Sequence, residues 1–408
     1  MTRLSECGSL HNLGTLPDDF APREIQILDL TLEGDCEEMA GVGLSHDARL
    51  AIARSLDGLG VARIAVLGNS PNPTPGEIAS AHAVAGLGLR AKLCSFTKSL
   101  PEIDTSARIG LWGTVILIAV NPAFFPTGRT GADIIAEARA MAGHARDLGL
   151  HVTLMAMDTT RADPAYVAQF LAQTEDLVDE FAICDSIGVA SPWGFEALIR
   201  AAKGWTDRPL QVHCHNHTGM GVANTLAAIR GGADVIHSCV NGLGEFAGQP
   251  ALEEIAVAIE MHLGLHTGLS LTRLTALSRL VEDVSGIAMP PHKAITGRAA
   301  FAIPETEEIQ EALNAASIDG RLDEALTFPP AWVGNRAQMS MGRKCNRHTV
   351  AFALAERGLT AAPEVCDRIA AAVRASVAGR AGHVLLTPPE FDQLLAAEDY
   401  AVKTLQPA

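Results

Sequence analysis

The sequence predicts an α/β protein built on a closed (β/α)8 TIM barrel, followed by a mostly helical C-terminal region. Short, continuously apolar runs alternate along the chain with longer amphipathic, alanine-rich stretches. Strands that are covered on both faces by helices have this continuously apolar character. Eight such runs follow one another at roughly the 30-residue spacing that one βαβ unit needs. An open, doubly wound parallel sheet is the rival architecture that the same pattern allows.

The eight expected strands define the first domain. They begin near Ile25, Arg63, Ala91, Thr114, His151, Glu180, Leu210 and Asp234. Amphipathic helix patterns lie between them, and several of these patterns end in glycine, the expected helix stop. The barrel is therefore predicted over residues 22–265. Residues 266–408 are predicted to form a helical region that covers the barrel mouth or joins two subunits into a homodimer.

Composition excludes several classes of partner. The 408 residues are 48% hydrophobic and carry a formal net charge of −16, which repels the phosphate backbone of nucleic acids. The eight cysteines show no Cys-x-x-Cys pair and are expected to be reduced. Neither a signal-peptide pattern nor an apolar run long enough for a membrane span is evident. We therefore expect a cytoplasmic protein without nucleic-acid or membrane partners.

Two histidines mark the end of the seventh expected strand. His213 and His215 point to the same side of a strand, because strand side chains alternate with a period of two. The carboxyl ends of barrel strands form the active-site mouth. Two imidazoles at that place suit a divalent transition metal whose shell is completed by oxygen ligands. Two buried histidines satisfied by hydrogen bonds are the alternative interpretation.

Carboxylates crowd the end of the first expected strand and the loop after it. They are Asp29, Glu33, Asp35, Glu37 and Glu38. Such crowding is costly unless a cation or a proton relieves it. We interpret the segment as part of the metal site and take Glu33 and Glu37 as candidate catalytic residues. A solvated acidic loop is the alternative.

The end of the eighth expected strand carries further candidates. Asn241-Gly-Leu-Gly244-Glu245 is followed four positions later by Gln249. Its glycines permit tight backbone turns next to a ligand. Glu245 could reach the mouth as a catalytic residue and Gln249 as a metal ligand. An ordinary strand-to-helix turn is the alternative.

In these segments the chain resembles the pyruvate carboxyltransferase-type, HMGL-like family of metal-dependent barrels. That family includes homocitrate synthase, 2-isopropylmalate synthase and citramalate synthase. The resemblance rests on segments that occur in family order, which are Arg161-Ala-Asp-Pro164, Asp185-Ser-Ile-Gly188, His213-Cys-His-Asn216, Asn241-Gly-Leu-Gly-Glu245, and Val333-Gly334 with Gly342-Arg343-Lys344. The last segment favours the synthase branch, because lyases resembling HMG-CoA lyase carry a cysteine in that loop. By resemblance, Ser186, Asn216, Asn241 and Gly244 are candidates for binding the co-substrate.

The first strand departs from the family pattern. There the family has Leu-Arg-Asp-Gly-Glu-Gln, in which the arginine polarises the keto-acid carbonyl and the next residue binds metal. Aligned backwards from Gly41, Asp35 takes the ligand position; aligned forwards from Asp29, the ligand position falls on Gly34. We prefer the backward alignment because it keeps a metal carboxylate. Both alignments lose the arginine, and Lys98 and Arg161 are the candidate replacement cations.

The resemblance implies a function and its cofactors. We expect a metal-dependent acyltransferase that joins an acyl-CoA, with acetyl-CoA the expected co-substrate, to a 2-oxo acid in a Claisen-type condensation. The expected metal ligands are Asp35, His213, His215 and Gln249, and zinc, manganese and magnesium all remain open. A metal-dependent carbon–carbon lyase or aldolase, or a catalytically inactive homologue, are the alternatives.

Overall fold

The computed structural model of the protein describes residues 4–18, 20, 23–68, 73–121, 128–303, 311–313, 326–381, 385–397 and 400–404. The chain forms two compact units, Met1–Met289 and Pro290–Ala408. The helix α11 (Leu274–Ser285) therefore belongs to the barrel unit.

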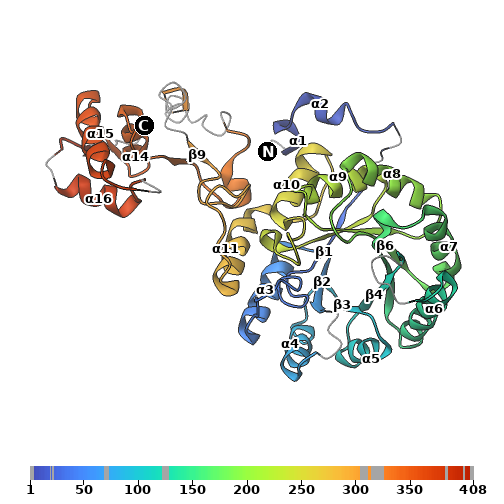
Figure 1. Cartoon of the computed structure of the whole chain (residues 1–408). Helices are drawn as coiled ribbons and strands as arrows, with labels where there is room; N and C mark the ends of the chain where they lie inside the picture. The colour runs from blue at the N-terminus through green and yellow to red at the C-terminus, as the bar shows by residue number, and fades with distance from the viewer. Residues whose placement is uncertain are drawn as a thin grey trace. The chain divides into compact units, whose positions relative to one another are not determined.

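The first unit is a closed barrel of eight parallel strands (Figure 1). The strands are β1 (Gln26–Asp29), β2 (Arg63–Leu67), β3 (Lys92–Thr97), β4 (Gly113–Ala119), β5 (His151–Met157), β6 (Glu180–Asp185), β7 (Leu210–Cys214) and β8 (Val235–Ser238). Each begins within one residue of its predicted start. β8 pairs with β1 in parallel, with Ile236 opposite Ile27. This pairing confirms the predicted barrel and excludes the open sheet.

Helices follow the strands around the outside of the barrel. They are α3 (His46–Leu59), α4 (Pro75–Ala85), α5 (Leu100–Ile109), α6 (Gly131–Asp147), α7 (Pro164–Thr174), α8 (Pro192–Lys203), α9 (Gly221–Gly231) and α10 (Leu252–His262). Local signals set their ends. Ser45 caps α3 with its side chain, and Gly60 ends that helix in the left-handed conformation. Two short helices, α1 (Leu4–Cys7) and α2 (Leu10–Leu13), precede the barrel.

The barrel interior is partly apolar and partly polar. Side chains such as Leu30, Phe96 and Met155 form an apolar cluster inside the strands. Arg63 and Glu180, also buried, form an ion pair with distances of 2.5 and 2.8 Å. A barrel interior is normally filled by layers of branched apolar side chains. A single charge in this interior would be costly, and here each of the two charges is neutralised by the other.

The second unit is mostly helical, as predicted. It contains α14 (Arg347–Ala355), α15 (Pro363–Val377) and α16 (Pro388–Ala397), and the short strands β9 (Ala302–Ile303), β10 (Gln338–Met339), β11 (Leu359–Thr360) and β12 (Lys403–Thr404). Val350, Val373 and Phe391 lie in its own apolar core. The predicted domain boundary at 265, and the lid and dimerisation roles of this region, stay predictions.

The cysteines and the apolar helices bear on two expectations from composition, that the cysteines are reduced and that the chain has no membrane span. All eight cysteines carry free thiols, and all except Cys7 are buried. Within the described parts of the chain, no helix has the length and apolar character needed to cross a membrane.

Candidate metal centre

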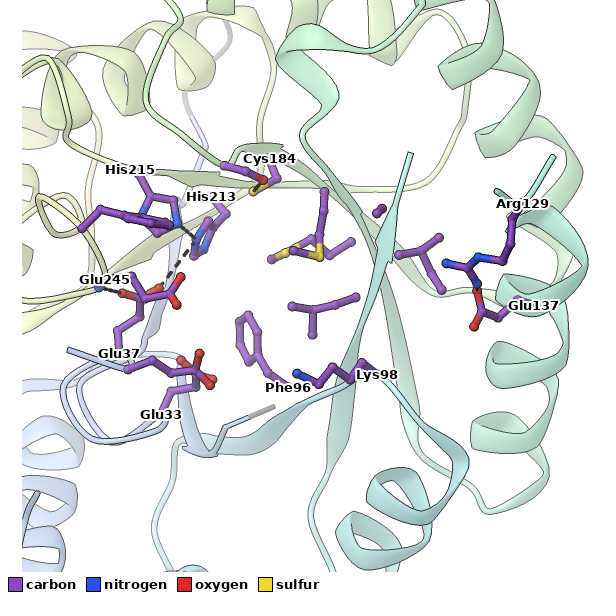
Figure 2. A pocket seen from close by; sticks show the side chains of 18 residues that line it. Glu33, Glu37, Phe96, Lys98, Arg129, Glu137, Cys184, His213, His215 and Glu245 are labelled. Carbon is purple, nitrogen blue, oxygen red and sulfur yellow. Dashed lines mark hydrogen bonds and ion pairs between the residues drawn. The ribbon is translucent and has the colours of Figure 1, made fainter. Parts of the chain in front are cut away.

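His213 and His215 lie together at the carboxyl end of β7. Both side chains are buried, and their Nε2 atoms are 3.2 Å apart. Figure 2 shows the two rings turned towards the same side of a pocket in the barrel mouth. Both imidazoles therefore lie on one side of the strand, as the alternation of strand side chains predicts, and both could bind the same metal ion.

A left-handed turn after β1 brings Glu37 to these histidines. Residues 34–38 all have positive φ, between 46° and 63°, and four of the five are not glycine. Each such residue costs roughly 1–2 kcal/mol relative to the right-handed conformation. The turn is held by backbone hydrogen bonds from Cys36 to Thr31 and from Glu38 to Glu33. As a result, Glu37 Oε1 lies 3.9 Å from His213 Nε2.

The chemistry of Glu37, His213 and His215 fits a divalent metal. One ligand atom from each lies within 4.8 Å of the others. Burial, reinforced by neighbouring imidazoles, lowers the pKa of His213 well below its usual value and that of His215 to about 4. Both rings are therefore neutral near pH 7 and offer lone pairs. Two imidazoles and one carboxylate form a donor set that zinc or manganese accepts.

Gln249 completes the cluster. Its Nε2 atom lies 3.0 Å from Glu37 Oε1, 3.0 Å from His213 Nε2 and 3.3 Å from His215 Nδ1. Its Oε1 atom is buried without a hydrogen-bond partner. The two amide atoms exchange places by rotating the side chain, so the oxygen can turn towards the other three residues. A buried amide oxygen without a hydrogen-bond partner, next to three potential ligands, is expected of a fourth metal ligand when no ion is bound.

Asp35 points elsewhere. Its Oδ2 atom accepts hydrogen bonds from Arg49 Nη2 at 2.8 Å and from the backbone of Leu44 at 2.9 Å. Arg49 lies on α3, and both members of this ion pair are buried. The structure therefore brings Glu37, and not Asp35, to the histidines, because the left-handed turn rotates successive side chains to different sides. The assignment of Asp35 as a ligand stays a prediction from the sequence.

The cluster forms one wall of a pocket of about 560 Å³. Its lining includes the carboxylates Glu33, Glu38 and Glu245 and the cation Lys98. Figure 2 shows Phe96, on β3, and Lys98, directly after β3, below the histidines, with Arg129 and Glu137 at the opposite end of the pocket. Burial and the neighbouring carboxylate of Glu38 raise the pKa of Glu245, against the opposite effect of Lys98. The pocket thus joins a candidate metal-binding wall to a lining that carries further acids and two cations, Lys98 and Arg129, of which Arg129 is ion-paired with Glu137.

The other predicted residues divide into those at the pocket and those near it. Ser186 lines the pocket. Gly244 lets Glu37 approach closely, because a Cβ atom there would lie 2.4 Å from Glu37 Oε2. Asn216 accepts a hydrogen bond from Gly221 at the start of α9, and Asn241 donates one to the backbone of Ser278. These two side chains hold loops around the mouth.

Arg161 is engaged outside the pocket lining. Its guanidinium forms hydrogen bonds of 2.8–3.1 Å with both carboxylate oxygens of Asp158. Pocket-lining residues that the sequence analysis missed include Phe96, Met155 and Cys184. All three lie at inward positions of strands, so period-two alternation on the predicted strands was the signal that could have found them.

Similarity to known proteins identifies the family of this chain. Residues 24–281 match the HMGL-like family. The chain belongs to this family. The expected resemblance is therefore confirmed, and the mouth of an HMGL-like barrel is where Glu37, His213 and His215 meet.

Relatives of this HMGL-like chain include two proteins with synthase names. The (R)-citramalate synthase CimA of Methanocaldococcus jannaschii is 31% identical over 352 residues, which cover 85% of this chain and 69% of the relative. A protein named probable 2-isopropylmalate synthase from Methanopyrus kandleri is 31% identical over 357 residues, which cover 86% and 70%. The chain is thus homologous to the citramalate and isopropylmalate synthases, as the loop after β8 indicated.

Solved structures share the fold at lower identity. The HMG-CoA lyase of Bacillus subtilis superposes with a TM-score of 0.59 at 16% identity, covering 66% of this chain and 96% of that one. The carboxyl transferase domain of Rhizobium etli pyruvate carboxylase gives 0.54 at 13% identity, covering 77% and 56%. These likenesses support the HMGL-like barrel fold alone.

Proposed function

We propose that this protein is a metal-dependent condensing enzyme that joins an acyl-CoA to a 2-oxo acid. The observation that carries the proposal is the convergence of Glu37, His213, His215 and Gln249 on one point in the pocket wall. Homology to citramalate and isopropylmalate synthases supplies the reaction class. Acetyl-CoA is the proposed acyl donor.

Four side chains would hold the metal. Glu37 supplies the charge, His213 and His215 supply neutral nitrogens, and Gln249 supplies its amide oxygen after rotation. When bound, a divalent cation supplies a Lewis acid and a template for the carboxylate and carbonyl oxygens of a 2-oxo acid. Zinc and manganese suit two nitrogen donors better than magnesium does.

Glu245 is the proposed general base. Burial and Glu38 raise its pKa, and a carboxylate with a raised pKa is a stronger base than an ordinary one. It would take a proton from the carbon next to the thioester carbonyl, and that carbon would then form a bond to the carbonyl carbon of the oxo acid. The resulting alkoxide takes up a proton, and hydrolysis of the thioester by water releases free CoA thiol. Glu38, beside Glu245, helps to keep the pKa of this carboxyl high.

Lys98 is the proposed counter-charge for the developing oxyanion. The family has an arginine at the end of the first strand, where this chain has Gly34 in one alignment and Glu33 in the other. Two cations lie in the pocket lining, Lys98 and Arg129, and Arg129 is ion-paired with Glu137. Arg161 is engaged with Asp158 outside the lining. Preorganised cations facing a developing negative charge contribute strongly to such reactions.

A free-thiol assay tests the proposal. Purified protein loaded with zinc, manganese or magnesium is mixed with acetyl-CoA and each member of a panel of 2-oxo acids. Thiol release that requires both substrates and the metal is the expected result. Formation of an oxo product from a single substrate without CoA release would show a lyase instead, and no turnover at all with a tightly bound metal would point to an inactive homologue.

A further inference from the structure

A buried polar chain runs through the barrel interior to the metal cluster. It begins at the ion pair of Arg63 with Glu180 and continues through Gln211 and His237 to His213. Glu180, Gln211, His213 and His237 are all at most 6% exposed. Buried polar groups are costly unless each is hydrogen-bonded, and none of these four has an unsatisfied side-chain atom. The chain is thus fully satisfied within the barrel.

The orientation of Gln211 is fixed by its neighbours. Its Nε2 atom donates to Glu180 Oε2 and, at 2.9 Å, to Thr153 Oγ1. Burial alone would raise the pKa of Glu180, but hydrogen bonds from Arg63 and His151 and the charge of Arg63 outweigh it and lower the pKa to about 2. The ionised carboxylate only accepts hydrogen bonds, so the amide nitrogen must face it. Gln211 Oε1 is therefore the atom that faces His237.

This orientation determines which nitrogen of His237 carries the proton. Its Nε2 atom lies 2.7 Å from Gln211 Oε1, an acceptor, and must donate. His237 is 1% exposed, and the one carboxylate of this polar chain, Glu180, is already paired with Arg63, so a second proton on the ring would be a buried charge without a partner. Its Nδ1 atom is then a bare acceptor.

The bare Nδ1 atom of His237 in turn determines which nitrogen of His213 carries the proton. The Nδ1 atoms of His237 and His213 are 3.1 Å apart, so the proton between them belongs to His213. A neutral His213 protonated on Nδ1 has its lone pair on Nε2, the atom that faces Glu37 and His215. In the orientation that Gln249 has in this structure, before any rotation towards a metal, its Nε2 donor lies 3.0 Å from His213 Nε2 and fits an unprotonated nitrogen there.

We propose that Gln211 and His237 are positioning residues that hold His213 in the Nδ1-protonated tautomer, so that its Nε2 lone pair is presented to a divalent metal. The inference rests on the proposed metal site. Outer-shell partners of metal-bound histidines act in this way, and losing one typically weakens metal binding by about 10–100-fold. Here the outer-shell partner of His213 is His237, which is held by Gln211. Gln211 is in turn held by the ion pair of Arg63 and Glu180 inside the barrel.

Substitutions at His237 test the chain. His237→Phe keeps a flat ring but removes both nitrogens, and should weaken zinc or manganese binding by about 10–100-fold. His237→Gln offers an oxygen to His213 and an NH2 group to Gln211, so it should restore most of the affinity. Gln211→Met should weaken binding, because His237 loses the acceptor that fixes its proton. Affinity is measured on the full-length protein by competition with a chromophoric chelator.

A matched control separates this effect from a general loss of barrel polarity. Thr114 is buried on β4 and hydrogen-bonds to Ser95 and Thr97, away from the chain of Gln211 and His237. Thr114→Val should leave the metal affinity unchanged. Thermal unfolding of every metal-free variant checks that it is folded.

A second readout does not need the metal. In metal-free protein labelled with 15N-histidine, NMR should show His213 protonated on Nδ1, and His237→Phe should abolish this single tautomer. His213 protonated on Nε2 in the wild type, or unchanged affinity in His237→Phe, would overturn the inference. Wild-type protein that shows the Nδ1 tautomer but binds no metal would instead refute the proposed metal site, so the two failures are distinguishable.

Discussion

Glu37, in the loop after β1, is joined to Gln249, in the loop after β8, by a hydrogen bond of 3.0 Å from Gln249 Nε2 to Glu37 Oε1. A second contact ties the same two loops, because the backbone of Glu245 donates to Glu37 Oε2 at 2.7 Å. β1 and β8 are the pair that closes the barrel. The candidate metal cluster is therefore built across the closure of the barrel, and the position of its carboxylate depends on both loops.

Glu37→Gln should abolish tight metal binding, because it removes the only charge among the three clustered ligands. The loss should exceed the ~10–100-fold typical of an outer-shell partner. Zinc at 100 times its Kd should stabilise the wild type by about 2.7 kcal/mol and this variant hardly at all. Thermal unfolding with and without metal measures the difference.

Asp35→Asn is the matched control for that experiment. It should keep the metal affinity but destabilise the fold by about 3–5 kcal/mol, since it leaves the buried Arg49 without its charge partner. The opposite pattern, in which Asp35→Asn loses the metal and Glu37→Gln retains it, would restore the ligand assignment made from the sequence.

The comparison of Asp35 with Glu37 shows where sequence reasoning ends. Strand positions could be predicted closely, because buried parallel strands are continuously apolar. The two histidines could be placed together, since a strand's side chains alternate strictly. The loop after β1 could not, because it adopts five successive left-handed residues that no local preference of cysteine or glutamate indicates.

Contacts between strands were also beyond the sequence. Gln211 lies two residues before His213, so the same alternation places both inside the barrel. His237 comes from β8, and its contact with His213 depends on how β8 is staggered against β7. That stagger is set by closure of the whole barrel rather than by either strand alone.

Lys98→Met should lower kcat/KM for condensation by about 10²–10³, by analogy with loss of an oxyanion-stabilising donor. Metal affinity should stay unchanged, because Lys98 lines the pocket without belonging to the ligand cluster. Steady-state kinetics of thiol release, with the metal Kd measured in parallel, test both statements.

Lys92→Met provides the control for charge removal, because Lys92 is exposed at the start of the same strand and absent from the pocket lining. Its kinetics should match the wild type. If Arg161→Met abolishes turnover while Lys98→Met does not, the catalytic cation is Arg161, as the sequence alone allowed.

Arg63→Met should destabilise the barrel by about 3–5 kcal/mol, because it leaves the Glu180 carboxylate buried without its cation. The pKa of Glu180 is lowered from 4.5 to about 2 in the folded protein. Its contribution is therefore complete above about pH 4.5 and is lost as the pH falls towards 2. Urea unfolding should show a penalty in Arg63→Met that shrinks below pH 4.5, and adding Glu180→Gln should recover part of it at pH 7.

Asp29→Asn should become more stable relative to the wild type as the pH rises from 5 to 7. Burial is the main cause that raises the pKa of Asp29 from 3.8 to about 7, with a smaller contribution from Glu253 and an opposing one from hydrogen bonds with Thr31. Between pH 5 and pH 7 the Asp29 carboxyl of the unfolded chain has released its proton, whereas that of the folded protein keeps it. The wild type therefore loses ~1.4 kcal/mol of stability per pH unit from this group until the pH reaches about 7. Asparagine keeps an oxygen for the backbone of Thr31 and has no proton to lose.

Urea unfolding of both proteins at several pH values measures that difference. Asp283→Asn, an exposed change on α11, should show no such trend. A gap between Asp29→Asn and the wild type that stays constant from pH 5 to 7 would mean that Asp29 is ionised in the folded barrel. A cation in the acidic loop after β1 would then have to compensate its charge.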